Sequence, residues 1–373
     1  MDSKEPGKGI LDKIQSWWLD FRHGYLNEEK LGWLLDISDA LTWKRWLIVA
    51  GVVFVISLGG CYAMLGSSGH HAHLDKSQKI YFTVREGMNA SDIADALLER
   101  GVIDSKFAFW WKVKTGGYQD QFKIGTYALH PQMAEEEVLA LLISGETARI
   151  KFTIPEGFKV EEIARRLADE GIADRKRFLR IARDFAPYSY MKKHENVDYA
   201  AEGFLFPDTY EVEPDMDEKA IMQMMFNDFD NRLNDELRER AREMDLSIYD
   251  LITLASLVEK EARYDEDRPI IAQVFFKRLK EDMPLQTDAS LQYLMDAPKE
   301  DVSIADTKID SPYNTYQNRG LPPGPIANPG MEAIEAVLYP ADTEYLYFVA
   351  DRDGHNHYSM TYDEHLVLVD RYR

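Results

Sequence analysis

An apolar segment near the N-terminus constrains this chain more than any other feature. Residues 46–65 read WLIVAGVVFVISLGGCYAML and contain no charged side chain. Twenty such residues in a helix span the roughly 30 Å hydrocarbon layer of a membrane. Lys44 and Arg45 precede the segment, whereas residues 66–74 contain neither Lys nor Arg. The positive-inside rule therefore predicts that residues 1–45 form a cytoplasmic arm and that everything after the segment lies on the outer side of the membrane.

The only cysteine of the chain, Cys61, lies inside this segment. The run Leu58-Gly59-Gly60-Cys61 resembles a lipobox, whose cysteine is lipidated and becomes the new N-terminus. Apolar residues continue beyond Cys61, which favours an intact membrane helix, and lipidation stays an open alternative. A single cysteine excludes internal disulfides, so the outer region must obtain its stability from a hydrophobic core.

The outer region is strongly acidic. Without the cytoplasmic arm, 37 Lys and Arg stand against 57 Asp and Glu. This charge argues against nucleic-acid binding, which depends on basic patches, and predicts repulsion from anionic lipid head groups. Residues 66–79 form a polar linker with His70, His71 and His73. Because no matching set of acidic or Cys ligands accompanies these histidines, we expect no metal site and no cofactor.

Two stretches seventy residues apart match each other. Residues 82–88 read FTVREGM and 152–158 read FTIPEGF, and an Ile-Ala pair follows each of them at 93–94 and 163–164. Each copy predicts a short strand, a turn at Glu-Gly and a helix that ends at a glycine. The first copy continues into a second helix and a strand, which gives the order strand, helix, helix, strand. The pattern over 80–195 resembles the LysM module, which binds chains containing N-acetylglucosamine, and a scaffold that only positions the following domain is the alternative.

The segment from Asp250 to Ala262 predicts a core helix. At about 100° per residue, one wide apolar arc contains Leu251, Ile252, Leu254, Ala255, Val258 and Ala262. Glu259 projects inside the margin of this arc. Burying an ionised carboxylate costs several kcal/mol, so such a group pairs with a cation or retains a proton, as a general acid does. The alternatives are an ordinary surface pair between Glu259 and Arg263, and Glu261 as the competing acid.

A set of motifs carries a family resemblance. The motifs are EGFLFPDTY at 202–210, LASLVEKE at 254–261, LQTD at 285–288, YNTY at 313–316, GLPPGPI at 320–326 and YLYFVA at 345–350 with a histidine downstream. In combination they resemble the YceG-like family of endolytic murein transglycosylases over about residues 80–373. The resemblance implies an α+β fold: an N-terminal transmembrane helix, a LysM-like βααβ subdomain within 80–195 and an α+β catalytic domain at 196–373.

The resemblance also implies a mechanism and a site. Glu259 takes the position of the catalytic acid/base, which protonates the bond between N-acetylmuramic acid and N-acetylglucosamine. The 6-hydroxyl of the muramic acid then attacks and leaves a 1,6-anhydro end. The resemblance places seven further residues at the substrate: Gln286, Thr287, Tyr313, Asn314, Thr315, Glu202 and His357. Among these, Glu202 could equally be a structural turn residue.

The implied partners are peptidoglycan glycan strands, the membrane and cell-wall synthases. The implied location is the bacterial inner membrane, with the catalytic part outside the cytoplasm. A membrane-tethered peptidoglycan-binding scaffold without activity is the alternative function. A carboxylate in an apolar setting separates the two, because a scaffold has no use for it.

Overall fold

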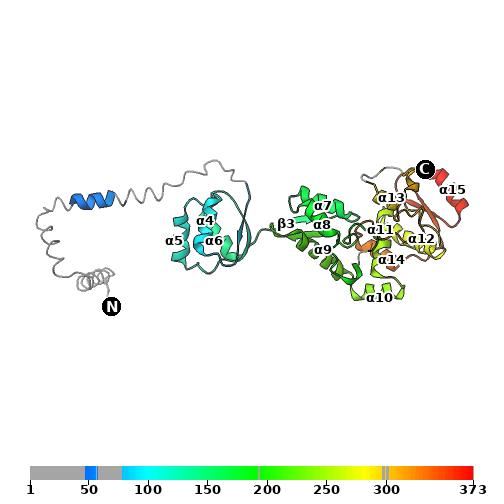
Figure 1. The fold of residues 1–373 in the computed structure, drawn as a ribbon, viewed down its shortest axis with the longest axis horizontal. Helices are drawn as coiled ribbons and strands as arrows, with labels where there is room; N and C mark the ends of the chain where they lie inside the picture. The colour runs from blue at the N-terminus through cyan, green and yellow to red at the C-terminus, as the bar shows by residue number, and fades with distance from the viewer. Residues whose placement is uncertain are drawn as a thin grey trace, which may run out of the picture. The chain divides into compact units, whose positions relative to one another are not determined.

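The computed structural model describes residues 47–55, 57, 78–191, 194–295, 299 and 302–372 (Figure 1). Contacts between residues divide the chain into two units. Of the described residues, the smaller unit comprises those up to Ile80 together with 88–121 and 129–139, and the larger comprises those within 81–87, 122–128 and 140–372. The described part is mainly helical, with three two-stranded sheets, so the expected mixed α+β class is confirmed.

The predicted membrane segment is described only at 47–55 and 57, which are helical. Within the described ranges, no helix combines the length and the apolar character needed to cross a membrane. The cytoplasmic arm and the rest of the predicted segment, including Cys61, lie outside the described residues, as do residues 66–77 of the linker. The membrane anchor therefore stays a prediction.

The first repeat copy has the predicted order of elements. Strand β1 (Ile80–Val84) is followed by α4 (Ala90–Glu99), α5 (Lys106–Gly116) and β2 (Gly125–Leu129), and β1 pairs with β2. The Asn89 side chain caps α4 and forms a reciprocal capping box, which satisfies backbone N–H groups that a helix start leaves open. Helix α6 (Glu135–Ser144) then leads to the second copy.

The second copy repeats this order. Strand β3 (Ile150–Thr153) is followed by α7 (Val160–Asp169), α8 (Arg175–Ala182) and β4 (Thr209–Val212). Strands β3 and β4 pair antiparallel, with Phe152 opposite Tyr210. The short 3₁₀ helix η1 (Ser189–Met191) lies between α8 and β4.

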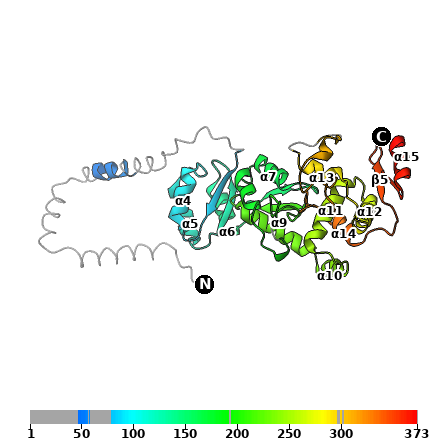
Figure 2. The same cartoon turned by 45° about the vertical axis from the view of Figure 1, so that its right-hand side comes forward.

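The remaining elements are mostly helical. In chain order they are α9 (Glu218–Arg232), α10 (Asp235–Glu243), α11 (Ile248–Glu261), η2 (Asp265–Asp267), α12 (Arg268–Lys280), α13 (Asp288–Tyr293), η3 (Asp306–Lys308), α14 (Met331–Leu338), β5 (Tyr347–Ala350), β6 (Asn356–Ser359) and α15 (Tyr362–Tyr372). Strands β5 and β6 form an antiparallel hairpin, and α15 lies beside it (Figure 2).

Helix α11 is the centre of the larger unit, as its sequence predicts. Every residue from Leu251 to Val258 is buried, and the helix packs against α12 and α14. The same hydrophobic core extends from Phe152 in β3 to Leu338 in α14. The second repeat copy and the helical region therefore share one core, while the domain limits drawn from the sequence stay a prediction.

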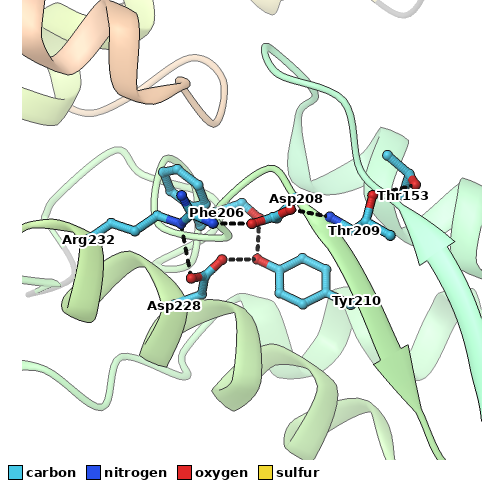
Figure 3. Close-up of polar contacts among 7 residues, drawn as sticks. All are labelled: Thr153, Phe206, Asp208, Thr209, Tyr210, Asp228 and Arg232. Carbon is cyan, nitrogen blue, oxygen red and sulfur yellow. Dashed lines mark hydrogen bonds and ion pairs between the residues drawn. The ribbon is translucent and has the colours of Figure 1, made fainter.

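Polar side chains of the motif at 202–210 contact side chains of α9 (Figure 3). The Arg232 guanidinium pairs with Asp208 and, at 3.0 Å, with Asp228, and it lies 4.6 Å from the centre of the Phe206 ring. The Tyr210 hydroxyl lies 2.6 Å from the Phe206 carbonyl oxygen and 3.2 Å from Asp228 Oδ2. These contacts give much of the motif a structural role.

Candidate active site

Two carboxylates lie at the C-terminal end of α11, on either side of Lys260. Positions two residues apart on a helix point about 200° away from each other, so Glu259 and Glu261 meet different neighbours. The two surroundings decide what each carboxylate can do.

Glu259 belongs to a largely buried ion pair. Its side chain is 8% exposed, and its Oε1 lies 3.5 Å from Nη2 of Arg268. The backbone N–H of Gly330, which caps the start of α14, donates to Oε2 at 3.3 Å. Glu259 therefore pairs with Arg268 of α12 and not with Arg263, whose guanidinium lies 5.9 Å from the Tyr264 ring centre.

A third carboxylate, Glu156, lies against the same glycine. A Cβ atom on Gly330 would lie 2.0 Å from Glu156 Oε1, so a larger residue there would force the Glu156 carboxylate to move. Burial raises the pKa of Glu156, and the negative charges of Glu259 and Glu332 raise it further. The local sequence pattern predicts Glu156 only as a turn residue of the repeat, because nothing in that pattern shows the distant neighbours.

Glu261 lies in a different setting. It is half-buried, and its Oε1 accepts hydrogen bonds from the Thr287 hydroxyl and, at 3.3 Å, from the backbone N–H of Ala289. Burial raises the pKa of Glu261, against the opposing effect of these two hydrogen bonds. Within the part of the chain that the structure describes, Oε2 receives no hydrogen bond. Burial thus favours the protonated form of Glu261, and Oε2 is the oxygen without a hydrogen bond from a described residue.

Glu261 lines a cavity of about 270 Å³ between the end of α11, the α12–α13 connection, the β5–β6 hairpin and α15. Besides Glu261, the polar and aromatic lining residues are Arg278, Gln286, Asp288, Tyr316, Tyr347, Phe348, Asn356, Tyr362 and His365. Amides and carboxylates bind hydroxyl and N-acetyl groups, and aromatic rings stack on the apolar faces of sugar rings. The lining therefore suits a saccharide unit.

Gln286 has an unusual backbone at the wall of this cavity. Its φ is +49°, in the left-handed region that non-glycine residues seldom adopt, and its N–H donates to the Thr315 carbonyl at 3.1 Å. Such conformations persist where the surrounding structure holds them, and they are enriched at functional sites. Gln286 is exposed, so its amide is available to a ligand.

Thr287 and Thr315 belong to a buried hydroxyl network behind this wall. The Thr287 N–H donates to the Thr315 hydroxyl at 3.0 Å, and that hydroxyl lies 2.9 Å from the Ser290 hydroxyl. Asn314 is fully buried, and its amide donates to the carbonyls of Thr307 and Ile309 at 3.1 and 2.7 Å. Thr315 and Asn314 therefore shape the loops, and Thr287 orients Glu261.

The remaining predicted site residues lie away from the cavity lining. Tyr313 is buried, with its ring 5.0 Å from that of Tyr293. His357 lies 2.9 Å from Asp351 and stacks on Tyr372 with 3.7 Å between ring centres.

Glu202 is 1% exposed and accepts hydrogen bonds from the Val160 N–H at 3.1 Å and from the Asn328 amide at 3.2 Å. Burial raises the pKa of Glu202 to about 8. These contacts join the start of α7 to the segment that follows the GLPPGPI motif, and they are contacts of the structural kind that is the alternative for Glu202.

Sequence reasoning missed most of the cavity lining. Arg278 extends from α12 and is held by the carbonyls of Leu346 and Leu285, at 2.8 and 2.7 Å. Its position among helix residues carries no signal of a site. Tyr347 belongs to the YLYFVA motif and Asn356 to the strand that pairs with it, and only the fold brings them to Glu261.

The comparison with known proteins identifies the family. The sequence profile of the YceG-like family matches residues 82–371. The chain belongs to the YceG-like family. A Bacillus subtilis protein named endolytic murein transglycosylase is 34% identical over 328 residues, which cover 84% of this YceG-like chain and 91% of the relative. A Streptococcus pneumoniae protein of the same name is 32% identical over 352 residues, which cover 84% of this chain and 64% of the relative.

A solved structure supports the family assignment. The 2.6 Å crystal structure of a YceG-like protein from Listeria monocytogenes is 32% identical to this chain and superimposes with a TM-score of 0.56. The match covers 78% of this chain and 99% of the Listeria chain. The described YceG-like architecture is therefore shared with a crystallographically determined relative.

Proposed function

We propose that this YceG-like protein is an endolytic murein transglycosylase, the activity after which its relatives are named. The observation that carries the proposal is the Glu261 carboxyl in a cavity whose lining suits a saccharide. The half-buried carboxyl has a raised pKa, and an acid that protonates a glycosidic oxygen near neutral pH needs this property. The substrate is the glycan strand of peptidoglycan.

The reaction needs one protein carboxyl. The carboxyl gives its proton to the glycosidic oxygen between N-acetylmuramic acid and N-acetylglucosamine, and the bond to the anomeric carbon breaks. The resulting carboxylate then takes the proton of the muramic 6-hydroxyl, whose oxygen bonds to the anomeric carbon and forms the 1,6-anhydro ring. No water is consumed and the carboxyl returns protonated, in contrast to glycoside hydrolysis, which uses two carboxylates.

Two glutamates compete for this role. The resemblance of the LASLVEKE motif assigns it to Glu259, whose two oxygens contact Arg268 and the Gly330 N–H. The geometry favours Glu261, because this residue lines the cavity and has one oxygen without a hydrogen bond from any described residue. We therefore assign the proton transfers to Glu261 and a supporting charge to Glu259.

The other lining residues hold the sugar. The amides of Gln286 and Asn356 would bind N-acetyl and hydroxyl groups, and the rings of Tyr347 and Tyr362 would stack on a sugar face. Arg278 would stabilise the carboxylate that Glu261 becomes after the first proton transfer.

The cellular setting follows from the predicted anchor. A single membrane helix at 46–65 would hold the catalytic part at the outer face of the inner membrane, near newly made glycan strands and the synthases that produce them. The LysM-like copies within 80–195 would bind glycan strands.

The test is mass spectrometry of the products formed by the full chain on uncrosslinked glycan strands. We expect 1,6-anhydromuramic ends from the wild type and the loss of these ends with Glu261→Gln. The matched variants are Glu259→Gln and Glu266→Gln, of which Glu266 is exposed and should tolerate the change. Thermal unfolding of each variant verifies that it folds.

Each other outcome has a definite meaning. If Glu259→Gln lost activity and Glu261→Gln retained it, the catalytic acid would be Glu259. Reducing ends in place of anhydro ends would identify a hydrolase. Binding of glycan without cleavage by the wild type would favour the scaffold.

A further inference from the structure

The outer face of α5 carries an exposed aromatic cluster in the smaller unit. Phe107 is 57% exposed and Trp111 is 54% exposed. Their rings stack with 6.1 Å between centres, Trp110 lies 6.4 Å from Phe107, and Lys114 Nζ lies 4.7 Å from the Trp110 ring centre. Positions 107, 110, 111 and 114 follow the spacing of one helix face. We call these four residues the α5 aromatic face.

This helix is apolar on two sides. Phe109 and Val113 are fully buried, so the inner side of α5 already has its core partner. An amphipathic helix at a protein surface presents charged side chains on its other side. Large exposed apolar groups in that position mark an interaction surface.

We propose that the α5 aromatic face lies in the lipid–water interface of the membrane that carries the predicted anchor. Trp is enriched at this interface because its ring is apolar and its N–H is polar. Helices with Trp and Phe on one side and Lys nearby bind there in the plane of the membrane. Helix α5 contains three Lys and no acidic residue.

The position in the chain supports this partner. Only 14 residues, 66–79, separate the predicted anchor from β1. Fully extended, they reach on the order of 50 Å, so the smaller unit cannot leave the neighbourhood of the bilayer. Because the anchor keeps the unit at a high effective concentration near the membrane, even a surface with low affinity for lipid can bind.

Charge does not oppose the contact. Residues 80–129 contain six Lys and Arg and six Asp and Glu, whereas the outer region as a whole is strongly acidic. The repulsion from lipid head groups predicted for the outer region therefore does not apply to the first repeat copy. Lys106 is paired with Asp95 at 2.5 Å, and Lys112 is paired with Glu135 at 3.3 Å and with Glu136 at 2.5 Å. Since two of the three Lys of α5 are paired within the unit, we expect the rings to contribute most of the binding, and added salt to change it little.

The experiment uses the full chain reconstituted in vesicles of phosphatidylethanolamine and phosphatidylglycerol. A bimane probe is attached at Thr115→Cys, one turn after Trp111, in a Cys61→Ala background. The matched control carries the probe at Glu99→Cys, an exposed position on α4. We expect lipids brominated near the head group to quench the Thr115 probe several times more than the control, with little change between 0.05 and 0.5 M salt.

A second variant tests the rings themselves. Phe107→Ser with Trp111→Ser should reduce quenching of the Thr115 probe to the control level, which corresponds to a loss of about tenfold in local binding, or 1.4 kcal/mol. Retained cleavage of soluble glycan strands, or an unchanged thermal unfolding curve if the chain has no such activity, shows that the variant is folded. Equal quenching at the two probe positions in the unsubstituted face would overturn the proposal. Release of the Thr115 probe from lipid by soluble glycan strands would also overturn it and identify a saccharide surface.

Discussion

The buried carboxyl of Glu202 provides a quantitative test of the shared core. Burial raises the pKa of Glu202 to about 8, although the hydrogen bond from the Val160 N–H favours the ionised form. The folded protein therefore holds this proton more tightly than the unfolded chain, where the pKa is about 4.5. The contribution of this proton to the unfolding free energy is fully present below the pKa of Glu202 in the unfolded chain. It is lost as the pH rises through the pKa of Glu202 in the folded protein.

The size of the effect follows from linkage. With pKa values of about 8 and 4.5, raising the pH from 6 to 9 removes on the order of 3 kcal/mol of unfolding free energy. For a unit of this size, that loss lowers the melting temperature by roughly 6–12 °C. Glu202→Gln has no charge at any pH in this range, and its amide retains one acceptor oxygen for Val160 and Asn328.

The assay is calorimetric melting of the wild type and Glu202→Gln at intervals between pH 6 and pH 9. Histidines and other groups titrate in both proteins, so the difference between the two curves isolates Glu202. We expect the melting temperature of Glu202→Gln to rise relative to that of the wild type as the pH increases. Two parallel curves would refute the reasoning, because they would mean that Glu202 has the same protonation in the folded and unfolded states.

Three further predictions follow from the same geometry. The reacting form of Glu261 is protonated and its pKa is raised, so kcat/KM should fall as the pH rises through that pKa. The positive charge of Arg278 lowers the pKa of Glu261, so Arg278→Met should move this alkaline limb of the pH–rate profile to higher pH. An unmoved limb would contradict the assignment. Gly203→Ala should lower the unfolding free energy by roughly 2–4 kcal/mol in urea, because φ of Gly203 is +88° and the new Cβ would lie 2.5 Å from the Pro325 side chain. The control is Gly171→Ala, at φ +70° with open space around it, which should cost roughly 1 kcal/mol. Asn328→Ala should cost about 3 kcal/mol or more in the same assay, since it leaves the Leu205 N–H, the Phe158 carbonyl and Glu202 without the Asn328 side chain; a loss below that of Gly171→Ala would contradict this account.

The sequence predicted the elements whose signals are local. The apolar arc of α11 and the strand, helix, helix, strand order of the first repeat copy depend on periodicity and turn residues within a few turns of chain, and the structure has both. It did not predict that β3 would pair with β4, because 56 residues separate Thr153 from Thr209.

The candidate site was harder to predict for the same reason. Helical periodicity correctly placed Glu259 at the edge of a buried face, but it could not show that Arg268 would neutralise it. The motif containing Gln286 and Thr287 indicated a wall of the site, and the structure brings both to Glu261. Glu156 and Asn356 could not be found, because the significance of each depends on a contact with a distant part of the chain.

The core shared between β3 and α14 also sets the order of events during synthesis. The amide of Asn328 contacts the carbonyl of Phe158 across 170 residues of chain. At 5–20 residues per second, a ribosome needs roughly 10–35 s to make that interval. For this time the Phe158 carbonyl lacks its Asn328 partner, so the contacts of this segment with the second repeat copy form only after most of the chain has been made.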